Sequence, residues 1–153
     1  MTTAWLTATE MRAWRNFMES TGLLMNALEA DLQSHDLTLG DYEVLVRLSD
    51  APDRSMRMCD LAGVLQLSPS GLTRRLDGMV RSGFVERVAC DDDRRVMHAH
   101  LTDVGLTKLE AAAPDHVHSV RTHLLGPLSP SQIEHIGDIF SVVRERLLEQ
   151  SAS

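Results

Sequence analysis

The stretch Leu67-Ser-Pro-Ser-Gly-Leu-Thr-Arg-Arg-Leu-Asp-Gly-Met-Val-Arg-Ser82 decides how this sequence folds. Ser68 is a favoured N-cap residue, and Pro69 suits the first helical position, where its missing N–H has no helical partner to lose. Gly83 follows the stretch, and glycine readily adopts the left-handed conformation that ends many helices. The stretch therefore predicts a helix that begins after Ser68 and ends near Arg81.

This predicted helix has two unlike faces. At about 100° per residue its apolar side chains share one side; they are Leu72, Leu76, Met79 and Val80. The opposite direction falls on Arg74, with Ser70 and Arg81 beside it. A helix that enters the DNA major groove needs a polar and basic outer face with an apolar face behind it. We therefore interpret Leu67–Ser82 as a DNA-recognition helix and expect Arg74 to contact base edges.

The other polar residues of this helix are candidate DNA contacts of a different kind. Ser68, Ser70 and the free N–H groups of the first turn suit a phosphate, because the helix dipole and unpaired donors point there. Thr73 and Arg75 lie on the two shoulders of the outer face, within reach of either backbone or base. The alternative interpretation is a solvated face on an ordinary short helix.

The neighbouring segments complete a DNA-binding lobe over residues 38–101. A helix is expected from Thr38, with Asp41 as its capping-box partner. A short extended piece at 55–58 leads into a short helix over about Cys59–Leu65, in which Cys59 is a candidate buried residue, and a tight turn follows at Gln66-Leu67. Strand-like runs at 84–89 and 96–101 then form a hairpin. Alternation in the second run places Met97, Ala99 and Leu101 on one face, with His98 and His100 on the other. This order predicts a winged helix-turn-helix.

The hairpin tip is the expected wing. Arg94 and Arg95 follow an acidic turn and could enter the minor groove, where the potential is most negative over narrow A·T tracts. Asp93 is expected to orient Arg95 as an ion-pair partner. The wing candidates for DNA contact are therefore Asp93, Arg94 and Arg95.

Charge is distributed unevenly along the 153 residues. The net charge is −7, yet residues 54–98 carry eight arginines against six acidic residues, so the acidity lies outside the middle of the chain. A locally basic face on an acidic body is compatible with DNA binding that depends on fit more than on bulk charge. The chain has no apolar run long enough for a membrane span, no expected signal peptide and only Cys59 and Cys90. We expect a cytoplasmic protein that does not bind membranes.

The two ends of the chain predict a second, helical lobe over residues 7–34 and 102–149. Thr7 and Glu10 form a capping box, and an apolar stripe at heptad-like spacing follows them. Further helices are expected from Thr102, with Pro114 inside it, and from Ser129. A chain this short gives the first helix few internal partners, so we expect a homodimer. The expected interface residues are Leu6, Trp14, Phe17, Leu124, Leu128, Ile136, Phe140 and Leu147, with packing inside one subunit as the alternative for some of them. The predicted fold class is mainly α, an α+β winged helix-turn-helix lobe with a helical dimerisation lobe built from the N- and C-terminal helices.

The sequence resembles the MarR family of bacterial transcriptional regulators. The resemblance covers Ser55–Leu109 and rests on four runs: Leu67-Ser-Pro-Ser-Gly-Leu-Thr-Arg-Arg-Leu76, Gly83-Phe-Val-Glu-Arg87, Asp93-Arg-Arg95 and Leu101-Thr102-x-x-Gly105. It implies a winged-helix domain on a helical dimerisation domain, and repression at a palindromic operator on double-stranded DNA that a small ligand often relieves. At matching positions it makes Ser68, Ser70, Thr73, Arg74 and Arg75 recognition-helix residues, and Asp93 and Arg95 the wing pattern.

The remaining features point to weaker hypotheses. The resemblance makes a pocket for a small aromatic or phenolic effector plausible, and Trp14, Met18 and Tyr42 are candidate lining residues, with core packing as the alternative. A metal- or redox-responsive regulator and a helical interaction protein without operator binding are the competing functions. No metal site is assigned, because His116, His118 and His123 offer no pair four residues apart. No catalytic motif is present, so we expect neither an enzyme nor a cofactor.

Overall fold

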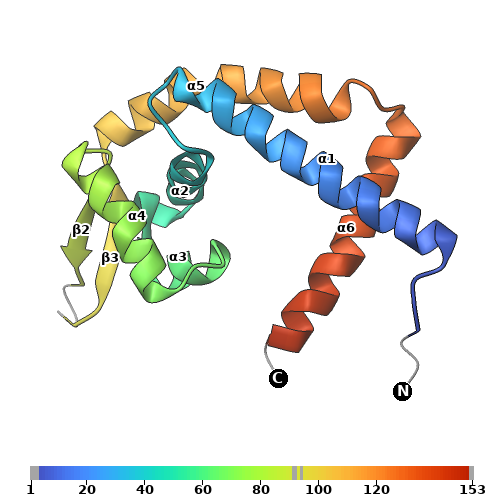
Figure 1. The fold of residues 1–153 in the computed structure, drawn as a ribbon. Coiled ribbons are helices and arrows are strands. Elements are labelled where there is room, and N and C mark those ends of the chain that lie inside the picture. Colours follow the sequence, from blue (N-terminus) through green and yellow to red (C-terminus); the bar gives the residue numbers. More distant parts are fainter. Residues whose placement is uncertain (1–3, 91–92, 94, 152–153) are drawn as a thin grey trace. The chain divides into compact units, whose positions relative to one another are not determined.

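The computed structural model describes residues 4–90, 93 and 95–151, and it is mainly helical with one small antiparallel sheet (Figure 1). The elements follow the predicted order, and the extended piece expected at 55–58 forms a regular strand. Their bounds are α1 Ala8–Gln33, α2 Leu39–Ser49, β1 Ser55–Arg57, α3 Met58–Val64, α4 Pro69–Arg81, β2 Val85–Ala89, β3 Met97–Leu101, α5 Asp103–Val120 and α6 Pro130–Ser151. A 3-10 turn at Pro52–Arg54 precedes β1, and a π-helical turn at Arg121–Leu125 follows α5.

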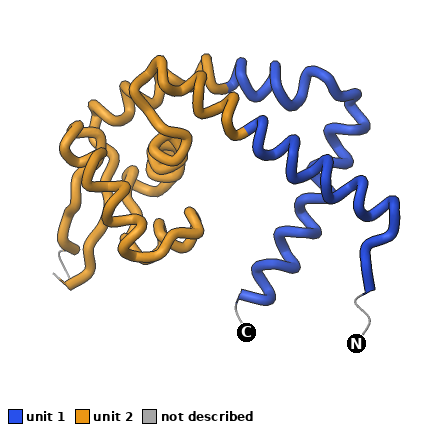
Figure 2. The backbone as a smooth tube through the Cα atoms, in the orientation of Figure 1, with its two compact units in different colours: residues 1–24, 117–153 blue, residues 25–116 orange. Residues whose placement is uncertain are grey.

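The chain divides into two compact units (Figure 2). One comprises Met25–His116 and holds α2, α3, α4, the sheet, the end of α1 and most of α5. The other comprises Met1–Leu24 and Val117–Ser153. The 25–116 unit contains the whole of the predicted lobe at 38–101, and the assignment of DNA binding and dimerisation to separate lobes stays a prediction.

The core of the 25–116 unit is aliphatic. Its largest fully buried side chains are Leu32, Leu45, Leu48, Leu61, Leu72, Leu76, Leu101, Val44 and Val85. They come from six of the elements, so α2, α3 and α4 bury their apolar stripes against each other and against one face of the sheet. Burial of these side chains is the main favourable term that holds α4 in place.

The sheet has the strand order β1-β3-β2, and both pairings are antiparallel. In its register Ala99 of β3 lies between Met56 and Arg87, and Leu101 faces Val85. Ala99 and Leu101 are fully buried, as the predicted alternation in the second strand requires, whereas Met97 of the same face is 37% exposed at the start of β3. The extended piece expected at 55–58 is thus a third strand that joins the edge of β3.

The predicted helix starts are confirmed by their capping bonds. Glu10 and Thr7 bond reciprocally, and Thr38 with Asp41 forms a complete capping box. Ser129 Oγ accepts the N–H of Gln132 at the start of α6. Helix α5 continues past Pro114 without a break, and the departure from α-helical hydrogen bonding comes later, at Arg121–Leu125.

The second unit buries few side chains of its own. Helix α6 has no buried residue over its 22 positions. The aromatic rings of Phe17 and Phe140 lie 5.4 Å apart, so α1 contacts α6, and Trp14 lies 6.3 Å from Phe17. Large apolar side chains nevertheless stay exposed on both helices, including Trp14 and Leu147.

Candidate nucleic-acid interface

Helix α4 is held by the tight turn that precedes it. Leu67 N–H donates to the carbonyl of Ala62 over 2.9 Å and Gln66 N–H to that of Gly63 over 3.2 Å, which closes the end of α3. Gln66 has a φ of 53°, a left-handed conformation. Ser68 then caps α4, and its Oγ accepts the N–H of Gly71 over 3.1 Å. The turn and cap predicted at 66–69 are therefore present.

The two faces of α4 are as the sequence predicts. Leu72, Leu76 and Met79 are at most 3% exposed, whereas Arg74 on the opposite side is exposed. Val80 was expected to share the buried face and is only half-buried. Arg74 makes no hydrogen bond or ion pair with any residue that the structure describes, so its guanidinium is available to a partner molecule.

The hydroxyl groups near the start of α4 have internal partners. Ser68 Oγ lies 3.2 Å from Ser70 Oγ, and Thr73 Oγ1 donates to the carbonyl of Pro69 over 3.0 Å. All three residues are exposed. The oxygens of these hydroxyls retain lone pairs, and the hydroxyl of Ser70 can rotate toward an incoming acceptor.

Arg75 differs from its neighbour Arg74. It is half-buried, and its guanidinium lies against Gly40 in the first turn of α2. Arg75 was expected on a shoulder of the outer face, which agrees with this position. The contact with α2 was not predictable from the sequence, because residues 40 and 75 are far apart in the chain.

The wing contains the expected ion pair. Arg95 donates to Asp93 from its backbone N–H over 3.0 Å and from Nε over 3.1 Å. The hydrogen bonds from the Arg95 side chain and backbone lower the pKa of Asp93 below its usual value. The Arg95 side chain is 91% exposed. Arg94, the other predicted wing contact, lies outside the described residues.

Arg87 is a residue of this region that the sequence analysis did not single out. Its Nη2 donates to the carbonyl of Thr73 over 3.0 Å and to Asp77 Oδ1 over 2.7 Å. These bonds connect β2, the first strand of the wing, to helix α4. The signal that could have found it is a basic residue on the solvent face of the strand that directly follows an amphipathic helix.

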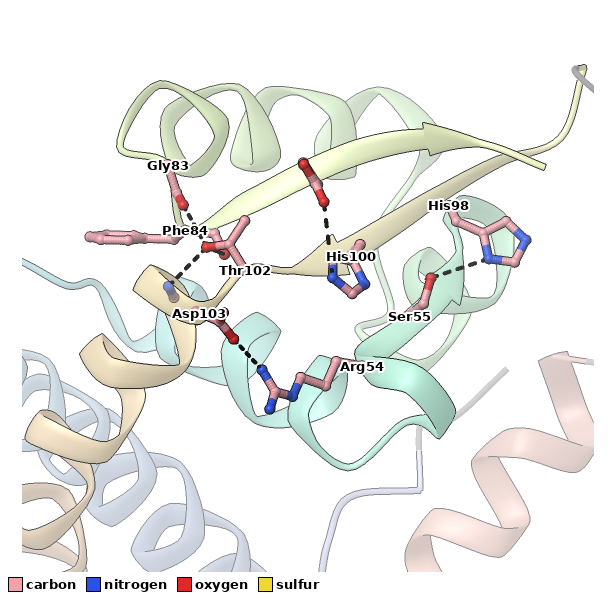
Figure 3. A network of polar contacts seen from close by, with 10 residues as sticks. Arg54, Ser55, Gly83, Phe84, His98, His100, Thr102 and Asp103 are labelled. Carbon is pink, nitrogen blue, oxygen red and sulfur yellow. Dashed lines mark hydrogen bonds and ion pairs between the residues drawn. The ribbon is translucent and has the colours of Figure 1, made fainter. Parts of the chain in front are cut away.

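A polar junction joins the end of α4 to the start of α5 (Figure 3). Thr102 Oγ1 lies 2.6 Å from the carbonyl oxygen of Gly83, to which it donates, and accepts the N–H of Gly105 over 3.0 Å. A Cβ at Gly105 would lie 2.1 Å from the carbonyl oxygen of Phe84. In the Leu101-Thr102-x-x-Gly105 run, Thr102 therefore caps helix α5, and Gly105 lets the start of α5 lie close to the backbone of Phe84.

Other polar pairs surround the sheet. Arg54 Nη1 lies 2.9 Å from Asp103 Oδ1, and His98 Nδ1 lies 3.4 Å from Ser55 Oγ (Figure 3). Within the described residues no three His, Cys, Asp or Glu side chains are grouped as a metal site would need. Cys59 was a candidate buried residue and is exposed.

The three candidate effector residues fall in different units. Trp14 and Met18 are exposed in the first 24 residues, and Tyr42 is buried in the 25–116 unit. The ring of Tyr42 lies beside that of His116, tilted by 39°, with the centroids 4.3 Å apart. Burial lowers the pKa of His116 and raises that of Tyr42, so both groups are favoured in their neutral forms. An effector pocket that uses all three residues stays a prediction.

Comparison with known proteins identifies relatives over nearly the whole chain. The MarR family model matches residues 37–97. Two solved MarR family regulators from Streptomyces coelicolor are similar. AbsC is 40% identical, with 96% of this chain and 99% of AbsC covered and a TM-score of 0.92. Sco3205, solved in complex with DNA, is 35% identical, with 95% and 92% covered and a TM-score of 0.91. The transcriptional regulator PecS of Dickeya dadantii is 26% identical over 128 residues, which are 82% of this chain and 76% of PecS.

In the part of the chain that the structure describes, none of the helices combines the length and the apolar character that a membrane crossing requires.

Proposed function

Because the chain belongs to the MarR family of transcriptional regulators, we propose that it is a sequence-specific repressor that binds an inverted-repeat operator as a homodimer. The relative Sco3205 was solved with DNA, and YetL of Bacillus subtilis, 27% identical over 118 residues, is named a transcriptional repressor. Those properties belong to the relatives. For this chain the proposal depends on its own helix α4.

The single observation that carries the proposal is the two-sided character of α4. Its apolar side chains are buried in the core, which fixes the direction in which the helix faces outward. Arg74 lies on that outward face and has no hydrogen-bond or ion-pair partner in the part of the chain that the structure describes. In this role Arg74 reads a guanine through two parallel hydrogen bonds, worth about 1–3 kcal/mol of discrimination. The same stretch of DNA is contacted by Ser68, Ser70, Thr73 and Arg75. The wing contributes its own DNA contacts through Asp93, Arg94 and Arg95.

A homodimer accounts for the exposed apolar surface of the 1–24 and 117–153 unit. Helix α6 buries no residue within the chain, and Trp14, Phe17 and Phe140 are each more than 40% exposed. Exposed apolar side chains in such number mark an interaction surface. The proposed interface comprises Leu6, Trp14, Phe17, Leu124, Leu128, Ile136, Phe140 and Leu147.

The dimer is tested by placing a charge on this surface. Phe140→Asp buries an unpaired carboxylate in the proposed interface and should shift the protein from dimer to monomer in sedimentation velocity at micromolar concentration. Glu110→Gln, on the exposed side of α5 in the other unit, is the control and should stay dimeric. A wild-type protein that sediments as a monomer would refute the proposed dimer.

Release by a small aromatic or phenolic effector is part of the proposal, with Trp14, Met18 and Tyr42 as candidate contacts. The supporting observation is that tryptophan, methionine and tyrosine side chains suit an aromatic ligand. Titration with a panel of aromatic acids and phenols should raise the operator dissociation constant for at least one member. A panel without effect, tested on active protein, would remove this part and leave operator binding standing.

The experiment that tests DNA recognition is selection from a random duplex library. We expect enrichment of an inverted repeat whose half-sites are about 10–10.5 base pairs apart, since two recognition helices of a symmetric dimer are one DNA turn apart. Arg74→Ala should lose the preference at one base pair of each half-site. If no sequence is enriched by dimeric, folded protein, the function is not operator binding.

A further inference from the structure

Adjacent arginines of α4 occupy unlike surroundings. Arg74 is exposed, whereas Arg75 is half-buried with its guanidinium over Gly40. A Cβ added at Gly40 would overlap Nη1, Cζ and Nη2 of Arg75. The backbone does not demand glycine at this position, because Gly83 is the glycine that has a positive φ among the described residues. The overlapping atoms are the end of the flexible Arg75 side chain, so a Cβ at Gly40 would displace the guanidinium and leave the backbone in place.

Glycine carries a cost at this place. Gly40 lies within helix α2, where glycine is the least favourable residue after proline. Glycine at position 40 allows the Arg75 side chain to lie close to the backbone of α2. The contact places the Arg75 guanidinium beside the backbone of α2, whereas Arg74 has no hydrogen-bond or ion-pair partner among the described residues.

Arg74 and Arg75 both border a groove of about 630 Å³ between the first turns of α2 and α4, and of the two only Arg75 lies over Gly40. The groove also contains two carboxylates, and both already accept backbone N–H groups: Glu29 that of Leu39 over 2.7 Å and Asp41 that of Thr38 over 3.3 Å. Among the described residues no carboxylate lies within ion-pair distance of Arg75, and its guanidinium has no hydrogen-bond acceptor.

We propose that Arg75, seated on Gly40, binds a phosphate of the DNA backbone in this groove, while Arg74 alone reads bases. A guanidinium matches phosphate through two parallel hydrogen bonds, and phosphate contacts fix the register of a recognition helix without reading sequence. Gly40 is then a positioning residue that acts through Arg75. This inference rests on the proposed operator binding. It assigns phosphate binding to Arg75 and base recognition to Arg74.

The salt dependence of binding tests the assignment. Each phosphate contact contributes about 0.9 to the slope of log K against log salt concentration, and a dimer makes each contact twice. Arg75→Gln should therefore lower the magnitude of that slope by roughly 1.8 and weaken operator and non-operator duplexes by the same factor. Arg74→Ala should instead reduce the ratio between the two duplexes.

A double-mutant comparison isolates Gly40. Gly40→Ala removes the seat of the guanidinium and should weaken binding in the wild-type background, with no further loss when it is added to Arg75→Gln. Thermal melting of each variant confirms that the fold persists. An equal loss from Gly40→Ala in both backgrounds would show a purely structural role for glycine and overturn its assignment.

Two other outcomes overturn the role of Arg75. One is an unchanged salt slope in Arg75→Gln, and the other is a selective loss of operator binding like that of Arg74→Ala. Both are distinct from failure of the proposed function, in which wild-type protein itself would show no preference for any operator in the same titration.

Discussion

Substitution of Gly105 by alanine tests how the wing lobe is joined to α5. The new Cβ would lie 2.1 Å from the carbonyl oxygen of Phe84 and 2.7 Å from Leu101 Cδ1. Ordinary van der Waals contact begins at 3.4 Å, so the helix start or the strand start must move by more than an ångström. The atom in the way is backbone, which cannot rotate aside as a side-chain terminus can.

The expected loss of stability follows from two opposing effects. Overpacking of a close contact costs typically about 1–3 kcal/mol, and a backbone obstacle places this site at the upper end. Alanine regains about 0.5–1 kcal/mol over glycine in a helix. We therefore expect Gly105→Ala to lower the free energy of unfolding by about 2 kcal/mol.

Urea unfolding followed by circular dichroism measures this change at a fixed protein concentration. With a denaturant slope near 2 kcal/mol/M, the midpoint should fall by about 1 M. Gly63→Ala is the matched control, because Gly63 lies in α3 of the same unit and nothing lies within 4 Å of its added Cβ. The control should be neutral or slightly stabilising. If Gly105→Ala is as stable as Gly63→Ala, the contact between Gly105 and the backbone of Phe84 does not require glycine, and the prediction is refuted.

Three further predictions concern single side chains. Ser68→Ala removes the cap of α4 and should cost about 1 kcal/mol of stability, visible as a lower melting temperature; an unchanged melting temperature would contradict the cap. Asp93→Asn removes the charged partner of Arg95 and should weaken operator binding measured by fluorescence anisotropy at pH 7, whereas equal affinity would show that the pair does not order the wing. Burial lowers the pKa of His116 in the folded protein, so as pH falls the unfolded chain takes up this proton before the folded one does. The folded state therefore loses stability as pH falls from about 6.5, the pKa in the unfolded chain, to the lowered pKa of the folded protein. His116→Phe should show a smaller fall in melting temperature between pH 7.5 and pH 5 than wild type; an equal fall would place the effect elsewhere.

Much of the fold follows from local sequence signals. The helix starts at Thr7, Thr38, Ser68 and Ser129 were predictable because a capping residue bonds to a partner three residues away, which the sequence displays directly. The faces of α4 were predictable for a similar reason, since a 3.6-residue period determines which side chains share a side.

What could not be predicted depends on contacts between distant segments. Strand β1 has only three residues, and its pairing with β3 joins residues more than 40 positions apart. The seat of Arg75 on Gly40 and the bonds of Arg87 to α4 arise only when separate elements pack. Exposure of Cys59 was missed because the apolar periodicity of a seven-residue helix is too short to define its buried side.

The central claim is that Arg74 on the outer face of α4 reads the operator sequence. The measurement that tests it most directly is the ratio of dissociation constants for the selected operator and for a duplex of scrambled sequence, at one salt concentration. Arg47→Ala, which removes an exposed arginine of α2 paired with Glu43, serves as the charge-matched control. Arg74→Ala should reduce the ratio by about thirtyfold or more, because the dimer loses the base contact in both half-sites, and the control should leave it within about twofold of wild type. An Arg74→Ala protein that keeps the wild-type ratio would contradict the claim.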